Sequence, residues 1–503
     1  MPEARSPTPS SCTSSSGLNA TILATSVVAG GWLRFRGLGA SDITADEAPT
    51  WLAASFATVR EVLHQGLELN PGKLAVHDVT LHFWMLAFGD DVTSIRALSA
   101  FLATLTIVLV FVVARELFAA DKDRAARWFA SDSTSIASLS AAVFALNVVA
   151  IRYSREGRMY ELMLDATLIQ LWFFLRTVRG GGFINYAGTT LFSILAIGTS
   201  FVAALVFLAE GVGLLYEMRP GAARWPYSWN VTASLLIAGA FIVVLTPWQL
   251  WIGKASYFGW IKPGLLEDYV RGLSSPALES PILLLTLILA GWGVIRGWNR
   301  YAEGIALALA LMLVPPIATA FRLGPTMLLV ATIYSWTPLF AHRWVLTSIV
   351  PLCILVALGI WELGSSTLRL AVLALVIVLA AVRIHSYDPN SGDAEWGVQW
   401  RAATDAVLPE LKAGRPVNVV PGYGMYAVRY YSRNDHVDPA LLTIDNRNAQ
   451  VLILADTANS LLPQVVPILR LRYPVRLARI RGVTVLATPL AITQPPEVAP
   501  AAH

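Results

Sequence analysis

Apolar segments of helix length recur along most of this 503-residue chain, and they constrain its fold more than any other feature. Each is roughly 17–25 residues long, enough for a helix to cross the hydrocarbon of a bilayer. Only 14% of the residues are charged, whereas soluble domains carry about a quarter. The runs are continuous, which argues against the alternating pattern of a transmembrane β-barrel. We therefore expect a polytopic α-helical membrane protein. The predicted spans are 18–33, 93–118, 135–151, 159–178, 230–250, 280–297, 303–321, 344–363 and 367–386.

The stretch 183–218 supplies two further spans. As one helix its length would reach roughly 54 Å, which is too long for a single crossing. Both flanks carry arginines, and the positive-inside tendency places both in the cytoplasm. A turn near Gly198-Thr199-Ser200 satisfies both facts. The prediction is about 11 transmembrane helices, with the N-terminus inside and the C-terminus outside.

The chain changes character after about residue 387, where the apolar runs become too short to span a membrane. The runs VNVV (417–420), VLILA (451–455) and VTVLA (483–487) predict buried strands. Segments 397–413 and 460–472 predict helices. The predicted organisation is a disordered cytoplasmic tail (1–17), a transmembrane domain (18–386) with a first outer loop (39–92), a small extracytoplasmic α/β domain (387–490) and a disordered tail (491–503).

Charge and cysteine content exclude other classes. The net charge of +4 is too small to indicate a nucleic-acid partner. Cys12 and Cys353 lie in unlike settings, a serine-rich tail and an apolar helix, which argues against a disulfide framework or a cysteine metal site.

The first outer loop contains two adjacent carboxylates, Asp46 and Glu47. Carboxylates close to a membrane surface can perform acid–base chemistry or hold a metal. The structural alternative is that Thr44 or Asp46 caps a helix over 47–63.

The same loop contains His77, Asp78 and His82, whose spacing is compatible with a metal site on a helix. The alternative is a set of ordinary surface residues.

The segment 151–165 carries arginines at the predicted outer face, against the positive-inside tendency. Arginine suits phosphate because it can donate two parallel hydrogen bonds. The alternative is a cluster that reaches the lipid headgroups. The residues are Arg152, Arg155 and Arg158, beside Tyr153, Glu156, Tyr160 and Glu161.

Other polar or aromatic features are less specific. The loop 248–271 is rich in aromatic residues that could stack on sugars, line a lipid groove or form an interfacial belt. Arg322 and the pair His342-Arg343 lie at predicted helix mouths. Asp165 and Glu210 lie inside predicted spans, where a carboxylate requires a partner or a cavity.

The order of these features resembles bacterial members of the GT-C glycosyltransferase superfamily, in particular protein-mannosyltransferase-like and lipid-A-glycosyltransferase-like enzymes that use polyprenyl-phosphate sugars. The match extends over roughly 40–435. Its most specific part is RYSREGRMY (152–160), similar to the YSQEARMY signature of that family. The proline-containing half of the first-loop motif is replaced by Lys73-Leu-Ala-Val-His77. The other matching features are Asp46-Glu47, HFWMLAFGDD (82–91), HRWVLTSIVPL (342–352), WRAATDAVL (400–408) and YAVRYY (426–431).

The resemblance implies roles for these residues. Asp46 would accept the proton of the acceptor hydroxyl, with Glu47 in support. Four cations would stabilise the departing lipid phosphate: Lys73, Arg155, Arg158 and Arg343. His77, Asp78, Glu156 and Tyr160 would support them, with Glu156 orienting Arg158 or His77. No metal ligand is assigned and no cofactor is expected, although a divalent metal is left open because the family has metal-using and metal-free members.

The expected function is therefore an integral membrane glycosyltransferase that transfers a sugar by a single inverting displacement. Its partners would be a polyprenyl-phosphate sugar donor, an extracytoplasmic acceptor (glycan, lipid or protein) and the lipid bilayer. Its location would be the bacterial cytoplasmic (inner) membrane, with the active site facing outside. The competing interpretations are a transporter or flippase of a lipid-linked or anionic substrate, and an inactive accessory subunit.

Overall fold

The computed structural model describes residues 10–70, 73–119, 132–200, 202–217, 281–321, 346–386 and 398–489, together with a few single residues between 233 and 239. Most of these residues are helical, and a small sheet lies near the C-terminus. The predicted span 230–250, the aromatic loop 248–271, Arg322 and the pair His342-Arg343 lie outside the ranges described in full. Residues 1–9 and the predicted C-terminal tail 491–503 also lie outside them. The predicted disorder of 1–17 is wrong for residues 10–17, because the first helix already begins at Ser10.

The chain divides into two compact units, which we call the helical unit and the sheet unit. The helical unit contains residues 1–36, 71–77 and 96–386. The sheet unit contains residues 37–70, 78–95 and 387–503. The sequence assigned the whole first loop to the transmembrane domain, whereas the structure groups most of it with the C-terminal domain, because side chains of the two segments pack and hydrogen-bond together.

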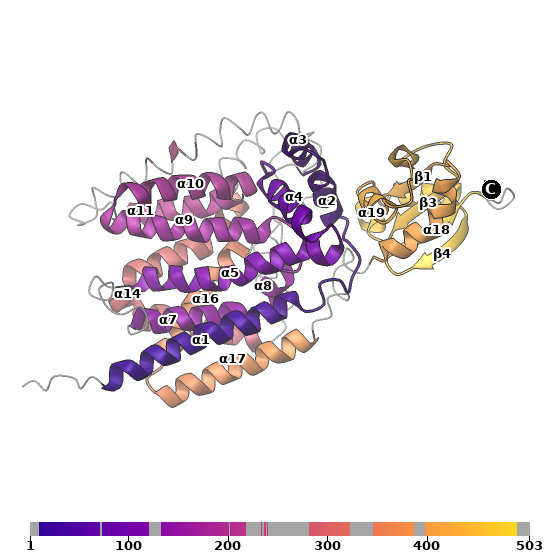
Figure 1. Cartoon of the computed structure of the whole chain (residues 1–503). Helices are drawn as coiled ribbons and strands as arrows, with labels where there is room; N and C mark the ends of the chain where they lie inside the picture. The colour runs from indigo at the N-terminus through magenta and orange to yellow at the C-terminus, as the bar shows by residue number, and fades with distance from the viewer. Residues whose placement is uncertain are drawn as a thin grey trace, which may run out of the picture. The chain divides into compact units, whose positions relative to one another are not determined.

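The helical unit is a set of packed apolar helices, in which α14 packs against α16, α9 against α10, and α7 against both α1 and α16 (Figure 1). The helices are α1 (Ser10–Phe35), α5 (Val92–Phe118), α7 (Asp132–Ala145), α8 (Val148–Tyr153), α9 (Tyr160–Gly180), α10 (Phe183–Thr199), α11 (Ala203–Glu217), α14 (Pro281–Phe321), α16 (Leu346–Trp361) and α17 (Ser366–Ser386).

Among the described residues, α5 is long and apolar enough to cross a membrane, with a mean hydropathy of 2.6 over 18 consecutive residues. Four shorter apolar helices accompany it, at Phe183–Thr199, Ala203–Leu214, Leu346–Trp361 and Ser366–Val382. The count of eleven spans stays a prediction.

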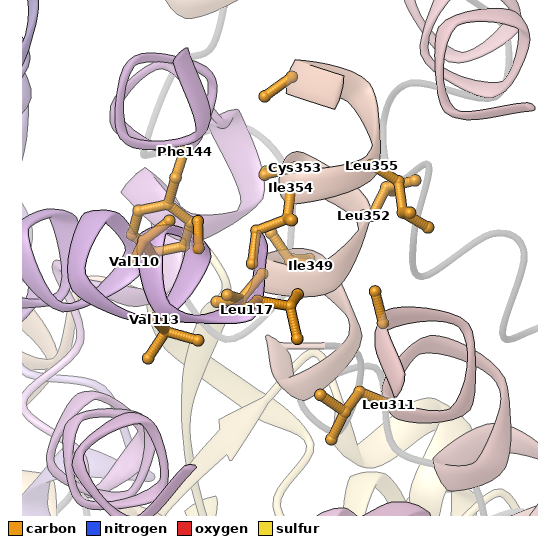
Figure 2. Close-up of a cluster of buried hydrophobic side chains, with 14 of the residues drawn as sticks. Val110, Val113, Leu117, Phe144, Leu311, Ile349, Leu352, Cys353, Ile354 and Leu355 are labelled. Atoms are coloured by element: carbon orange, nitrogen blue, oxygen red, sulfur yellow. The ribbon is translucent and has the colours of Figure 1, made fainter. Parts of the chain in front are cut away.

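Side chains from several of these helices meet in one apolar core. Figure 2 shows Val110, Val113 and Leu117 of α5 with Phe144 of α7, Leu311 of α14 and several residues of α16. In α16 every side chain from Leu346 to Ile360 is buried. Burial all round a helix of this composition is the pattern of a central helix.

Local signals explain where the helices break. The predicted turn in 183–218 is confirmed, because α10 ends at Thr199 and α11 begins at Ala203. The predicted span 135–151 is wrong as one helix. Asn147 interrupts it, and its side-chain oxygen caps α8 by accepting from the Ala150 N–H at 2.9 Å. The spans 280–297 and 303–321 meet at Tyr301, whose backbone is non-helical.

The first-loop part of the sheet unit forms α2 (Glu47–Ala54), α3 (Val59–Leu69) and most of α4 (Val76–Phe88). The continuous helix 47–63 of the structural alternative is not formed, because α2 ends at Ala54 and α3 begins at Val59. Thr58 starts α3 with a capping box, in which its hydroxyl accepts from the Glu61 N–H while the Glu61 carboxylate accepts from the Thr58 N–H. These hydrogen bonds stabilise a new helix start at Thr58, so α2 and α3 are separate helices.

The C-terminal part is a five-stranded sheet of order β2-β1-β3-β5-β4. Strand β1 pairs in parallel with both β2 and β3, whereas β5 pairs antiparallel with both β3 and β4. The three predicted strands are confirmed as β1 (Val417–Val420), β3 (Val451–Ala455) and β5 (Val483–Ala487). The other elements are α18 (Trp400–Lys412), α19 (Gly424–Tyr431), η3 (Pro439–Leu441), β2 (Leu442–Thr443), α20 (Ala458–Leu461), α21 (Val465–Arg472) and β4 (Val475–Ile480).

Candidate functional site

The adjacent carboxylates of the first loop occupy different environments. Glu47 is buried, with 1% of its surface exposed, and its carboxylate accepts from the Thr44 N–H at 2.9 Å. In return, the Thr44 hydroxyl accepts from the Glu47 N–H at 3.1 Å. Asp46 is only partly buried and stands at the N-cap of α2 without a side-chain capping bond. Thr44 and Glu47 therefore supply the capping interaction, and the Asp46 carboxylate is not consumed by it.

Residues of the C-terminal domain hold the chain just before these carboxylates. The Asp42 carboxylate accepts from the Arg401 backbone N–H at 2.8 Å. The Tyr431 hydroxyl accepts from the Ile43 N–H at 2.9 Å. Burial raises the pKa of Tyr431 above its usual value of 10, so the phenol stays protonated. The segment leading into Asp46 is thus fixed by two long-range contacts.

Sequence reasoning missed this positioning role. Arg401 and Tyr431 belong to WRAATDAVL and YAVRYY, which carry part of the family resemblance. The sequence shows Tyr431 in this motif, but it does not show that its hydroxyl binds the Ile43 N–H, because the two residues are 388 positions apart.

The helical unit contains a separate cationic cluster of Lys73, His77 and Arg158. Lys73 and His77 are each 1% exposed, and Arg158 is 8% exposed. Burial, followed by the charges of Lys73 and Arg158, lowers the pKa of His77 well below 6.5. His77 is therefore neutral at pH 7. Cations concentrated in a buried place are suited to a phosphate group.

Backbone contacts position this cluster. The Leu74 N–H donates to the Gly198 carbonyl at 2.7 Å, which ties the Lys73 segment to the end of α10. The Ser99 hydroxyl donates to the Arg158 carbonyl at 3.3 Å. The Arg158 N–H donates to the Glu156 carbonyl at 2.8 Å within the short turn between α8 and α9.

The remaining residues of the arginine motif have distinct surroundings. The Arg155 guanidinium donates to the Arg36 carbonyl at 2.5 Å at an exposed position. Glu156 is buried, with 8% exposed. Tyr160 is also buried and meets Tyr153 edge-to-face, with ring centroids 5.8 Å apart. Arg155 therefore has a structural partner in addition to its predicted role.

Asp78 and His82 belong to the sheet unit. Asp78 is fully buried, and its carboxylate accepts from the Asn70 amide at 3.3 Å. His82 Nδ1 lies 2.9 Å from the Ala54 carbonyl, so this nitrogen carries the proton and donates. Within the described ranges there is no group of three His, Cys, Asp or Glu side chains arranged to hold a metal. Arg343 lies outside the described residues.

The carboxylates inside the apolar helices have partners. Asp165 accepts from the Thr106 hydroxyl at 2.6 Å, and Glu210 accepts from the Gln170 amide at 2.9 Å. Each carboxylate thus has one partnered oxygen between neighbouring helices. Among the described residues, Asp165 Oδ2 and Glu210 Oε1 are buried without a hydrogen-bond partner.

Comparison with known proteins finds similar folds among solved structures. No family model and no curated protein matches the sequence. The structure is similar to ArnT from Cupriavidus metallidurans in the apo state, with a TM-score of 0.57 and 13% identity over 96% of this chain and 100% of that one. It is also similar to the same protein bound to undecaprenyl phosphate, with a TM-score of 0.51 and 14% identity over 95% and 99% of the two chains.

ArnT is a GT-C superfamily member and a polytopic membrane protein. The expectation from the sequence resemblance is thus confirmed at the level of fold: this chain has the GT-C fold, with a small sheet domain near its C-terminus.

Proposed function

We propose that this protein is an integral membrane glycosyltransferase that uses a polyprenyl-phosphate-linked sugar as its donor. The observation that carries the proposal is the buried cluster of Lys73 and Arg158 around a neutral His77, in a chain with the GT-C fold. ArnT, which shares that fold, binds undecaprenyl phosphate, a polyprenyl phosphate. The cluster offers the positive charge that such a phosphate requires.

The proposed reaction is a single displacement at the anomeric carbon. The acceptor hydroxyl attacks that carbon, and the bond from the carbon to the lipid-phosphate oxygen breaks. The phosphate leaves with the electron pair and is stabilised by Lys73 and Arg158, with Arg155 and Arg343 as further cations. The Asp46 carboxylate accepts the proton of the acceptor hydroxyl. The configuration at the sugar inverts.

We assign roles to the supporting residues from the contacts that they make. Glu47 positions Asp46 through the reciprocal bonds with Thr44. Glu156 and Tyr160 shape the turn that carries Arg158, while His77 and Asp78 fill the segment after Lys73. We place the protein in the bacterial inner membrane with about eleven spans, its active site and C-terminal domain outside, acting on a glycan, lipid or protein acceptor.

The decisive test compares wild type with Asp46→Asn and Glu47→Gln, each purified in nanodiscs with radiolabelled polyprenyl-phosphate sugars and membrane-extract acceptors. We expect Asp46→Asn to slow transfer by about 100-fold or more because the base is lost. Its melting temperature should stay close to that of wild type, because asparagine has the shape of aspartate and is an equally favourable N-cap residue. Glu47→Gln keeps an oxygen for the Thr44 N–H and should retain most of the activity.

Three outcomes would change the assignment. Full transfer by Asp46→Asn with a dead Glu47→Gln would move the base to Glu47. Full transfer by both variants would exclude a base role for this pair. No turnover of any donor, together with label crossing a sealed bilayer, would replace the transferase with a transporter.

A further inference from the structure

Helix α21 of the sheet unit has apolar side chains on two opposite faces. Val466 and Leu469 are 4% and 9% exposed, and they pack in a core with residues of strands β1 and β3. Ile468 and Leu471, on the other face, are 66% and 82% exposed. Because a helix that is apolar all round is normally buried all round, the exposed face is suited to a partner.

The exposed apolar face of α21 extends beyond these two side chains. Helical spacing places Pro467 beside Ile468 and Leu471, and Pro467 is also exposed. Val465 and Leu462, at the start of the helix and just before it, are 42% and 37% exposed. Single exposed apolar residues are common on proteins, whereas a contiguous patch indicates an interaction surface. We call these residues the outer face of α21.

Arginines flank the outer face, and few carboxylates offset them. The sequence from 457 to 496 contains no Asp or Glu. Arg470 is exposed, and its Nη2 donates to the neutral side-chain oxygen of Asn459 at 3.3 Å. Arg472 is partly compensated, since its Nη1 lies 3.5 Å from the Asp445 carboxylate. The segment that carries the outer face is therefore strongly cationic. Its arginines are Arg470, Arg472, Arg476, Arg479 and Arg481.

The composition of the outer face and its flanks is that of a helix that lies in the interface of an anionic bilayer. In that arrangement apolar side chains enter the boundary between headgroups and acyl chains, and guanidinium groups bind the lipid phosphates. A lipid surface is available to this domain, because residues 387–397 join it covalently to α17, a predicted span. Such a tether keeps the effective concentration of the surface high. Charge and attachment therefore both favour lipid over a soluble partner.

We propose that α21 docks the C-terminal domain on an anionic lipid surface. Ile468 and Leu471 enter the apolar boundary of the bilayer, while Arg470 and the neighbouring arginines bind lipid phosphates. Docking gives the domain a second attachment to the membrane besides its covalent link to α17. This interaction goes beyond the proposed function and does not depend on sugar transfer.

The test places the full chain in nanodiscs of phosphatidylcholine, alone or with phosphatidylglycerol, and attaches a spin label at Ile468→Cys. Cys12→Ser removes one native cysteine, and Cys353 is buried. The label reports collisions with oxygen, which concentrates in lipid, and with a water-soluble nickel chelate. With phosphatidylglycerol we expect more oxygen collisions and fewer nickel collisions. A label at Ala440→Cys, exposed in the same domain but outside α21, should stay in water in both discs.

Two substitutions in the labelled chain separate the apolar and the charged contributions. Leu471→Ser should lower the ratio of docked to free domain about tenfold, because serine gains little from leaving water. Arg470→Gln should lower it about fivefold, the effect of one cation near an anionic surface. The matched control is Arg429→Gln, because Arg429 lies on α19 and lines a pocket beside Trp51 instead. It should dock like the unsubstituted chain, and equal melting temperatures would exclude misfolding.

Three results would overturn the proposal. Equal nickel collisions in both discs would show that the outer face stays in water. Protection from nickel without a rise in oxygen collisions would show that protein covers the face, either another part of this chain or a second copy. Equal docking by Arg470→Gln and the unsubstituted chain would show that the anionic headgroups are not recognised.

Discussion

At the scale of single residues, the two adjacent carboxylates of the first loop lie in different environments. Glu47 points into the protein and exchanges hydrogen bonds with Thr44. Asp46, one position earlier, stays partly exposed at the N-cap. The pairing of these residues in the sequence predicted a site, but which of the two is buried depends on side-chain direction at the start of α2.

A pH prediction follows from His77 at the same scale. Its pKa in the folded protein is well below 6.5 because of burial and the nearby Lys73 and Arg158. Below pH 6.5 the unfolded chain binds a proton that the folded chain rejects, so stability falls as the pH falls. The slope approaches about 1.4 kcal/mol per pH unit at most. Melting temperature between pH 7.5 and 5 should therefore drop more steeply in wild type than in His77→Gln.

This comparison cancels the contributions of all other titrating groups, which both proteins share. Parallel pH profiles for the two proteins would show that His77 is not held neutral in the folded state.

At the scale of elements, close helix packing in the helical unit depends on glycine. A Cβ at Gly359 of α16 would lie 1.9 Å from the Leu289 carbonyl oxygen of α14. A Cβ at Gly293 would lie 2.6 Å from the Gly359 nitrogen. Small residues of this kind allow two helix backbones to approach directly, as is common between membrane helices.

Gly359→Ala should therefore force α14 and α16 apart. We expect a loss of about 1–3 kcal/mol, the usual cost of overpacking, and a lower melting temperature. Gly291→Ala is the control on α14, because a Cβ there meets nothing within 4 Å. It should be neutral or slightly stabilising, since alanine favours a helix. Equal melting temperatures for the two variants would contradict the packing argument.

At the scale of the whole molecule, the first loop and the C-terminal domain form one unit through both an apolar and a charged contact. Trp51 is 4% exposed and packs edge-on against Tyr430. The ion pair of Asp90 and Arg433 is more accessible, with side chains 46% and 26% exposed. Burial of the large apolar ring should outweigh an exposed ion pair, because solvent screens the latter.

We therefore expect Trp51→Ala to destabilise the sheet unit by about 3–5 kcal/mol. Asp90→Asn should cost under about 1 kcal/mol, since an amide oxygen can still accept from Trp51. Hydrogen exchange at residues 42–54 would measure the loosening of the loop. A larger effect from Asp90→Asn than from Trp51→Ala would show that charge, not apolar burial, holds the loop.

Local chemistry was sufficient to predict several parts of this protein. The apolar runs of α5 and α16, the turn after Thr199 and the strands β1, β3 and β5 follow from composition over a few residues. The edge strand β4 was missed because Arg476 and Arg479 interrupt its apolar residues and none of its six residues is buried. The break at Asn147 was missed because one capping residue interrupts an otherwise apolar run.

Motifs in the sequence also indicated the class of site, since Asp46, Lys73 and Arg158 were candidates before their surroundings were known. Only the tertiary structure decided which of the two carboxylates is buried and which contacts hold the loop before Asp46. These features join residues hundreds of positions apart. A local pattern reports the preference of a short segment for helix or strand, whereas such pairings depend on which surfaces the folded chain buries together.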